Sequence, residues 1–277
     1  MIREAEFLMT NNTNNDFKAV DVCYMYDGSF YGMLSCVFES FELKEMPVQI
    51  TSSEFSLFRI KYIETDEAKA QRILKGVAIK IGGEALKHIK LSFLANIENK
   101  EIALIHFLIE GFKYGRKFIQ RIYTGFSPPS KVVVASAINN PYIAKLSKGI
   151  DLLTLEGHKF VQFVRFSEIN GALVSIIEPE NNVLPLLAEH FIDRFINEQF
   201  LIYDKTRKLG LIYTDNKARI EFIDYEMPVL SKEEKDYQKL WRLFYNTIAI
   251  KERKNERCRM NFMPKKYWKN MTEFLTE

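Results

Sequence analysis

The stretch that decides the fold runs from residue 20 to residue 41 and reads VDVCYMYDGSFYGMLSCVFESF. In residues 20–26, Val and Tyr side chains alternate with the residues between them, which predicts a β-strand. Residues 27–29 read Asp-Gly-Ser, a combination typical of a sharp turn. From residue 30 to 41, apolar residues recur at helical spacing and would form one stripe of a helix. The sequence therefore predicts a strand, a tight turn and a helix in succession.

The elements before residue 157 continue from that unit. Residues 1–19 contain an Asn- and Thr-rich run and predict a disordered leader. Residues 58–64 predict a second strand, and residues 66–156 predict a helical region. Asp66 is its expected N-cap, and Gly82-Gly83 is expected to end its first helix. Further helices are expected over residues 99–123 and 140–156.

The second half of the chain changes its period. Residues 158–166 and 172–177 predict a hairpin around residues 169–171. A helical stripe over residues 184–195 follows, and then strands at 200–203, 209–214 and 218–222. Ser231 opens a capping box for a last long helix. Its buried stripe is predicted to comprise Tyr237, Leu240, Trp241, Phe244, Tyr245 and Ile248.

These patterns predict an α+β fold, with a central helical region, a mixed hairpin and helix part, and C-terminal helices. Residues 20–277 are expected to form a single α+β domain. A division into a helical subdomain at 66–156 and a sheet-plus-helix subdomain at 158–277 is the alternative.

Composition places the chain among folded proteins, because 47% of its residues are hydrophobic and 13% are aromatic. Its three cysteines, Cys23, Cys36 and Cys258, lie far apart and form neither a disulfide framework nor a metal-ligand pair. We find no signal peptide, and no apolar run approaches the roughly 20 residues that span a bilayer. A cytoplasmic protein without a membrane partner is expected.

Charge is distributed unevenly along the chain. Residues 239–269, which we call the basic segment, contain ten basic and two acidic side chains, a net charge of +8. The whole chain carries +3, which leaves −5 for the remainder. Basic charge concentrated in this way indicates a polyanionic partner.

Motifs for cofactors are absent from the sequence, which contains no phosphate-binding loop, no dinucleotide-binding glycine pattern and no His-Glu-x-x-His pair. We therefore expect no cofactor and no metal. The ionisable residues that could serve a reaction are Asp27, His158, Glu178 and His190. A purely structural role is the more frequent one for isolated histidines such as His158 and His190.

Two groups of residues are candidates for nucleic-acid binding. In the predicted strand at 158–166, Lys159 and Arg165 share one face and could hold phosphates, although Arg165 could equally be paired with an acid inside the fold. In the basic segment, Lys and Arg could neutralise phosphates while an aromatic ring stacks on a base. The candidates there are Lys251, Arg253, Arg257, Lys265, Lys266 and Tyr267.

Four segments of the chain carry a resemblance to a known family. They are Tyr26-Asp27-Gly28-Ser29-Phe30; His158-Lys159 with Phe163-Val164-Arg165-Phe166; Glu178-Pro179 with His190-Phe191 and Arg194-Phe195; and Trp241 to Trp268, ending in Met263-Pro264-Lys265-Lys266-Tyr267-Trp268. In this order they resemble the bacterial "probable DNA metabolism protein" family, a domain of unknown function. The resemblance implies a DNA context, because members are typically encoded beside a radical SAM protein of DNA modification or repair.

Three functions remain open at this point. The first is a DNA-binding accessory protein that presents DNA to a radical SAM partner; the chain itself lacks the Cys-x-x-x-Cys-x-x-Cys cluster motif of such an enzyme. The second is a DNA-processing enzyme, of lyase, nuclease or glycosylase type, that uses the four ionisable candidates. The third is a subunit whose basic end docks an acidic protein.

Overall fold

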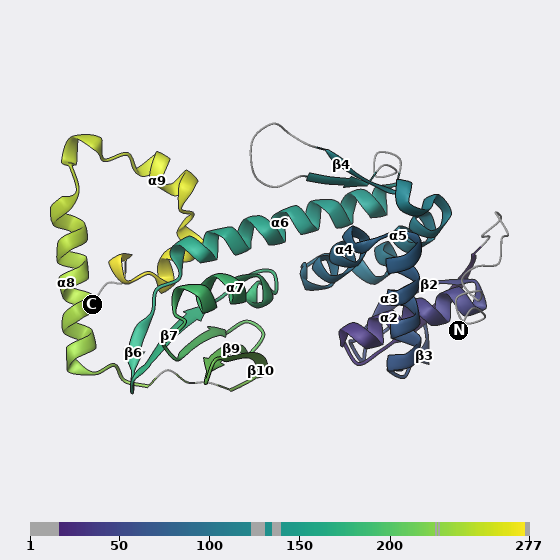
Figure 1. Cartoon of the computed structure of the whole chain (residues 1–277), viewed down its shortest axis with the longest axis horizontal. Coiled ribbons are helices and arrows are strands. Elements are labelled where there is room, and N and C mark those ends of the chain that lie inside the picture. Colours follow the sequence, from purple (N-terminus) through teal and green to yellow (C-terminus); the bar gives the residue numbers. More distant parts are fainter. Residues whose placement is uncertain (1–16, 123–130, 135–139, 225, 227, 275–277) are drawn as a thin grey trace. The chain divides into compact units, whose positions relative to one another are not determined.

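The structure of the protein is a computed structural model that describes residues 17–122, 131–134, 140–224, 226 and 228–274. Helices and strands are mixed, so the predicted α+β class is confirmed. The chain forms two compact units, Met1–Leu152 and Leu153–Glu277 (Figure 1). The leader predicted over residues 1–19 lies outside the described residues as far as residue 16, and a strand already begins at Lys18.

A three-stranded parallel sheet organises the N-terminal unit. Strand β1 (Lys18–Met25) is central, with β2 (Glu45–Thr51) on one side and β3 (Arg59–Tyr62) on the other. Helix α2 (Phe30–Leu43) makes the crossover that parallel β1 and β2 require. The Ser29 hydroxyl caps this helix by accepting from the Gly32 amide at 2.9 Å. The predicted strand, turn and helix are therefore confirmed, whereas β2 was not predicted.

Helices α3 (Glu67–Lys80), α4 (Gly83–Leu94) and α5 (Lys100–Tyr114) contribute further residues to this unit's core. The Asp66 side chain caps α3 as predicted, by accepting from the Lys69 amide at 3.0 Å. The helix predicted over 99–123 ends earlier, because Gly115 adopts a positive φ of 60° that suits glycine. A 3-10 turn η1 (Gly115–Lys117) and a two-stranded ribbon of β4 (Ile119–Ile122) and β5 (Lys131–Val134) follow it.

A five-stranded sheet organises the C-terminal unit, in the order β10-β9-β8-β7-β6. The strands are β6 (Ser167–Ile169), β7 (Ala172–Ile177), β8 (Phe200–Asp204), β9 (Leu209–Thr214) and β10 (Lys217–Phe222). Neighbours β7 and β8 are parallel and are joined by helix α7 (Leu184–Arg194), while the other pairs are antiparallel. The predicted turn at 169–171 is confirmed, with Asn170 and Gly171 both at positive φ.

The strand predicted over residues 158–166 is wrong, because helix α6 (Pro141–Phe163) continues through most of that stretch. Buried Leu153 and Phe160 are seven residues apart, which places both on one side of the helix. The alternation of residues at 158–163, which resembles that of a strand, thus lies at the end of a helix with one buried side. As a result, Lys159 and Arg165 do not share the face of a strand.

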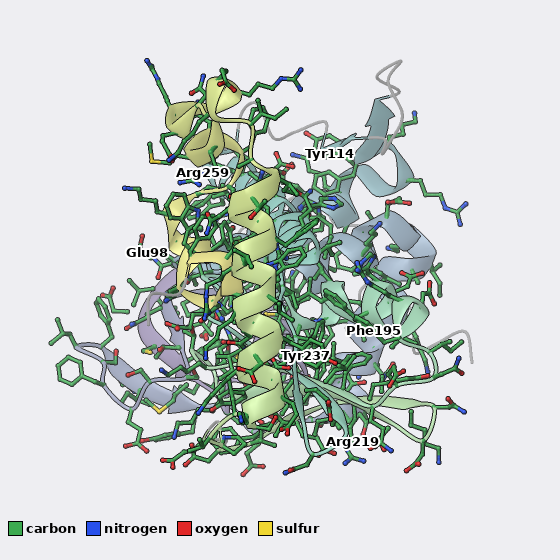
Figure 2. The ribbon with its side chains drawn as sticks, turned by 90° about the vertical axis from the view of Figure 1, so that its left-hand side faces the viewer. Glu98, Tyr114, Phe195, Arg219, Tyr237 and Arg259 are labelled. Carbon is green, nitrogen blue, oxygen red and sulfur yellow. The ribbon has the colours of Figure 1, made fainter. Side chains whose placement is uncertain are left out.

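The C-terminal segment comprises α8 (Lys232–Ile248), η2 (Lys251–Arg253), α9 (Glu256–Phe262), η3 (Lys265–Asn270) and η4 (Thr272–Phe274). Ser231 caps α8 as predicted, since its hydroxyl accepts from the Glu234 amide. The buried stripe predicted for α8 is wrong: no residue of this helix is buried, and Tyr237 is 71% exposed (Figure 2). Amphipathic spacing predicts an apolar face but not what covers it.

No helix within the described ranges is both long enough and apolar enough to cross a membrane.

Candidate functional site

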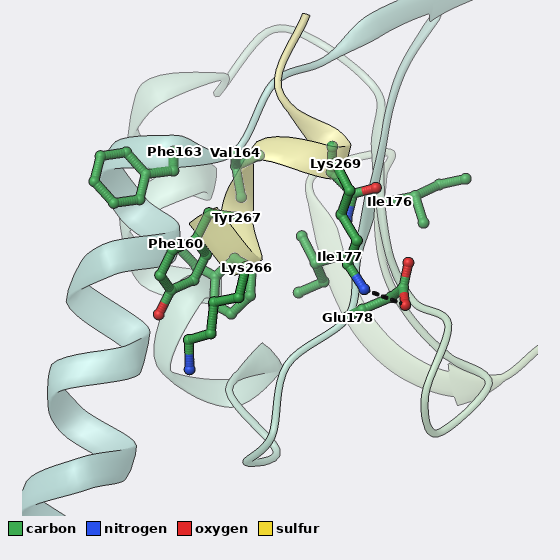
Figure 3. Close-up of a pocket in the computed structure, with 10 residues that line it drawn as sticks. Phe160, Phe163, Val164, Ile176, Ile177, Glu178, Lys266, Tyr267 and Lys269 are labelled. Atoms are coloured by element: carbon green, nitrogen blue, oxygen red, sulfur yellow. Dashed lines mark hydrogen bonds and ion pairs between the residues drawn. The ribbon is translucent and has the colours of Figure 1, made fainter. Parts of the chain in front are cut away.

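Tyr267 joins two of the segments that carry the family resemblance. Its ring lies 5.1 Å from the ring of Phe160 and 5.4 Å from that of Phe163, so η3 packs against the end of α6 (Figure 3). Only 7% of the residue is exposed, and burial raises the pKa of its phenol although nearby Lys266 lowers it. From the sequence, the Tyr267 ring was a candidate to stack on a nucleic-acid base. In the structure its ring belongs to the core of the C-terminal unit.

This placement predicts a strong effect on stability. Replacing Tyr267 with alanine should lower the free energy of unfolding by about 3–5 kcal/mol, the range for removing a buried aromatic ring, whereas Tyr267→Phe should cost less than about 1.5 kcal/mol. Urea denaturation followed by tryptophan fluorescence would measure both, because the only two tryptophans, Trp241 and Trp268, lie in the C-terminal unit. A Tyr267→Ala variant as stable as the wild type would contradict a core role.

A buried carboxylate on α6 fixes the loop that follows β7. Glu156 is 5% exposed and accepts hydrogen bonds from the amides of Glu180 (3.1 Å) and Asn181 (2.8 Å), and from the Asn181 side chain (2.7 Å). Since a buried charge needs such partners, this contact ties the loop to the helix. Glu156 was not singled out by the sequence analysis, although it lies on the buried side of α6, between Leu153 and Phe160.

Arg207 binds the same loop from the turn after β8. Its guanidinium donates to the carbonyl oxygens of Pro179 and Glu180, and it forms a 3.0 Å ion pair with Asp204. The Asp204 side chain is completely buried; burial raises its pKa, while the bonds from Arg207 and Thr206 act in the opposite direction. The loop after β7 is thus held on both sides by charged groups.

Two lysines of η3 are ion-paired with this loop. Lys266 lies 2.9 Å from a carboxylate oxygen of Glu180 and 3.5 Å from one of Glu156. Lys269 lies 2.5 Å from Glu178, as the dashed line in Figure 3 shows. Because carboxylates already neutralise both lysines, Lys266 is a weaker candidate for phosphate binding than the sequence alone indicates. Glu178, a catalytic candidate from the sequence, is ion-paired with Lys269.

The space between these residues is small. Phe160, Phe163, Tyr267, Glu178 and Lys269 line a cavity of about 10 Å³ (Figure 3). That volume holds about one water molecule. The ion pairs between η3 and the loop after β7 therefore stabilise the C-terminal unit, and the cavity beside them is too small for a substrate.

Arg165 is engaged in the fold as well. Its Nη2 and Nε donate to the two carboxylate oxygens of Glu273 at 2.7 and 3.2 Å, and its Nη1 donates to the carbonyls of Gln162 and Val164. The Glu273 side chain is only 3% exposed; its burial acts to raise its pKa, but the bonds from Arg165 and Trp241 outweigh this and lower it. The sequence left two interpretations of Arg165 open, phosphate binding and pairing with an acid. In the structure, Arg165 is paired with Glu273.

Lys159 also binds within the unit. Its ammonium donates to the Phe262 carbonyl at 2.8 Å and lies 5.7 Å from the centre of the Phe163 ring. It thereby connects α6 to the end of α9.

His158 and His190 line one groove, formed by α6 and α7. Both are exposed, and Glu189 and Asp193 line the groove with them. Gly157 allows the close approach of the helices, because a Cβ there would lie 3.3 Å from Leu186. Two imidazoles beside two carboxylates could transfer protons. Within the part of the chain that the structure describes, no group of three or more His, Cys, Asp or Glu residues is arranged to hold a metal ion.

Asp27 lies in the N-terminal unit, at the edge where the parallel strands end. Its two oxygens accept from the Ser29 amide at 2.9 Å and from the Thr65 hydroxyl at 2.8 Å. Slight burial acts to raise its pKa, but these bonds lower it overall, so the carboxyl is ionised at neutral pH. Glycine at position 32 admits the carboxylate, because a Cβ there would lie 2.2 Å from Asp27 Oδ1.

The four catalytic candidates line three different pockets. Asp27 lines a pocket of the N-terminal unit, Glu178 lines the small cavity, and His158 and His190 share a groove. General acid–base chemistry requires its groups to surround one substrate. Within the C-terminal unit, Glu178 lines a different pocket from the two histidines.

Exposed cations remain in the basic segment. Arg253, Arg257 and Lys265 are exposed, and among the described residues neither arginine has an ion-pair partner. Lys254 is also exposed and lies 3.4 Å from Glu256. The side chain of Lys251 lies outside what the structure describes, although its backbone begins η2. Among the described side chains of the basic segment, Arg253, Lys254, Arg257 and Lys265 are therefore available to a polyanion.

Arg259, a further cation of the basic segment, takes part in packing within the C-terminal unit. It pairs with Glu256 and lies over the rings of Trp268 (4.7 Å) and Phe274 (5.1 Å), which stack on each other at 4.4 Å. Such cation–π contacts fix α9 on η3 and η4. The Trp268 ring is therefore part of the packing beneath the exposed cations.

Comparison with known proteins gives one family. The model of a domain of unknown function, DUF4130, matches residues 98–273. This range includes the second, third and last of the four segments that carry the resemblance, but not residues 26–30. No curated protein matches the chain. No solved structure matches it either.

Proposed function

The chain belongs to the DUF4130 family, a domain of unknown function, and we propose that it is a DNA-binding accessory protein of DNA repair or modification that works with a radical SAM partner. The observation that carries the proposal is the set of exposed cations at Arg253, Lys254, Arg257 and Lys265. Such side chains gain affinity for DNA by neutralising phosphates and releasing counterions. The DNA context and the partner rest on the resemblance of the four segments.

Four of the sequence-predicted binding residues have partners within the fold, and this refines the proposal. Arg165, Lys159, Lys266 and Tyr267 each have partners within the C-terminal unit. We therefore assign them to positioning the basic segment, and we assign phosphate contacts to Arg253, Lys254, Arg257 and Lys265. Contacts to phosphates provide affinity for DNA but do not recognise the bases, so little preference for a particular DNA sequence is expected.

Fluorescence anisotropy with labelled single-stranded and duplex DNA over a salt series tests the proposal. Binding that weakens steeply as salt increases is expected for four phosphate contacts, with a slope of about −3 to −4 in log K against log salt for duplex DNA. Absence of binding to either form, with the partner present as well as without it, would contradict the proposal.

A second candidate function is favoured by one observation, the groove that His158 and His190 share with Glu189 and Asp193. In this alternative the protein is a DNA-processing enzyme with proton transfer in that groove, and Asp27 and Glu178 are not part of the site. Incubation with DNA and analysis for strand scission or base release distinguishes the two. Product formation that His158→Ala and His190→Ala abolish would support the enzyme, whereas intact DNA would contradict it.

A further inference from the structure

Helix α8 has an apolar stripe that the described residues leave exposed. Tyr237, Leu240, Phe244 and Ile248 follow one another at helical spacing and are 71%, 60%, 53% and 58% exposed. Figure 2 labels Tyr237 on this helix. A surface helix normally buries such a stripe, and contiguous apolar patches of this kind mark sites of protein association.

Contacts on a neighbouring face of α8 hold the stripe outward. Glu234 accepts from the Glu168 amide at 3.2 Å, and the Gln238 side chain donates to Ser167 at 3.1 Å. Farther along, Trp241 donates to Glu273 at 3.3 Å and the Tyr245 ring lies 5.8 Å from that of Phe274. These contacts recur at helical spacing on a face next to the stripe, so the helix cannot turn its apolar residues inward without losing them.

Charge at the two ends of the stripe indicates what covers it. Glu233 lies four residues before Tyr237, in line with the stripe, and it is exposed. Just beyond the other end, Arg253 and Lys254 are exposed. A second copy of the helix in the antiparallel direction would place Glu233 of each stripe toward Arg253 of the other.

We propose that α8 is a dimerisation helix, and that two copies of this chain pair their α8 stripes antiparallel about a two-fold axis. Glu233 of each copy then lies near Arg253 of the other, and in the dimer the phosphate contacts rest on Lys254, Arg257 and Lys265. Antiparallel pairing makes one stripe complementary to itself, which is the requirement for a two-fold interface.

The exposed area agrees with such a pair. At roughly 100 Å² for each of the four stripe residues and for neighbouring Leu243, each copy would cover about 500 Å² of apolar surface. Two copies together approach the lower limit of specific interfaces, about 1,200 Å². We therefore expect a dimer that dissociates on dilution.

Sedimentation velocity over a concentration series, without DNA, tests the proposal. Wild-type protein is expected to shift from monomer to dimer as its concentration rises. Leu240→Glu should abolish the dimer while circular dichroism stays unchanged, because the Leu240 side chain does not contribute to the core. A monomer at every concentration, or a dimer that Leu240→Glu leaves intact, would overturn the proposal.

A charge exchange tests the antiparallel direction. Glu233→Arg and Arg253→Glu should each weaken the dimer roughly tenfold, because each places like charges together at two symmetric positions. The double variant should restore the wild-type dissociation constant. If it is no tighter than the single variants, the antiparallel pairing is wrong; Lys217→Glu, on the distant strand β10, is the matched control and should have no effect.

Discussion

Replacing Arg165 with alanine is expected to lower the free energy of unfolding of the C-terminal unit by about 3 kcal/mol. The substitution leaves the Glu273 carboxylate, 3% exposed, without its guanidinium partner. Removing one member of a buried ion pair costs about 3–5 kcal/mol, and the lower value applies because Arg165 itself is 28% exposed. The pair also joins η4 to the end of α6, so packing of the C-terminal segment is expected to loosen as well.

Urea denaturation followed by tryptophan fluorescence measures this loss. Arg219→Ala is the matched control, since the Arg219–Glu221 pair is about half exposed on both sides and should contribute less than about 1 kcal/mol. Equal losses in the two variants would mean that the Arg165–Glu273 pair does not brace the unit.

The pH dependence of the free energy of unfolding provides a second test of the Arg165–Glu273 ion pair. The pKa of Glu273 is lower in the folded protein than in the unfolded chain, so its contribution is complete above the unfolded pKa and is lost as the pH falls through the folded pKa. In Arg165→Ala, the buried carboxyl has no counter-ion and favours its neutral form. The stability difference between wild type and variant should therefore narrow on acidification.

The double variant Arg257→Glu, Lys265→Glu is expected to weaken DNA binding by roughly a hundredfold. Each contact between a charged donor and a phosphate is worth about 1.5 kcal/mol, or about tenfold in affinity, and reversal of the charge adds repulsion. Both side chains are exposed, on α9 and at the start of η3, so no loss of stability should accompany the change.

Lys266→Ala is the matched control for this prediction. Lys266 is ion-paired with Glu180 and Glu156, so its removal should change affinity for DNA much less than the double substitution does. Anisotropy at one fixed salt concentration measures all three proteins. A Lys266→Ala variant that binds as weakly as the double variant would show that the loop ion pairs open to admit phosphate.

Local signals of the sequence predicted the elements whose ends are encoded in a few residues. Ser29, Asp66 and Ser231 cap α2, α3 and α8 as expected, since a hydroxyl or carboxylate that accepts from the first turn is a local interaction. The turn at Asn170-Gly171 is local in the same sense.

Long-range contacts account for what could not be predicted. Residues 158–163 alternate like a strand, but burial of Phe160 against Tyr267, far away in the sequence, favours the helix. The roles of Arg165 and Lys266 depend on Glu273 and Glu180, about 100 residues away. A single sequence gives the charge of such residues but not the partner that neutralises it.

The salt dependence of duplex-DNA binding by Arg257→Ala, Lys265→Ala beside the wild type tests the central claim most directly. If the exposed cations of the basic segment contact phosphates, the slope of log K against log salt should flatten by about two units, one for each lost contact. An unchanged slope would contradict the claim that this segment binds DNA.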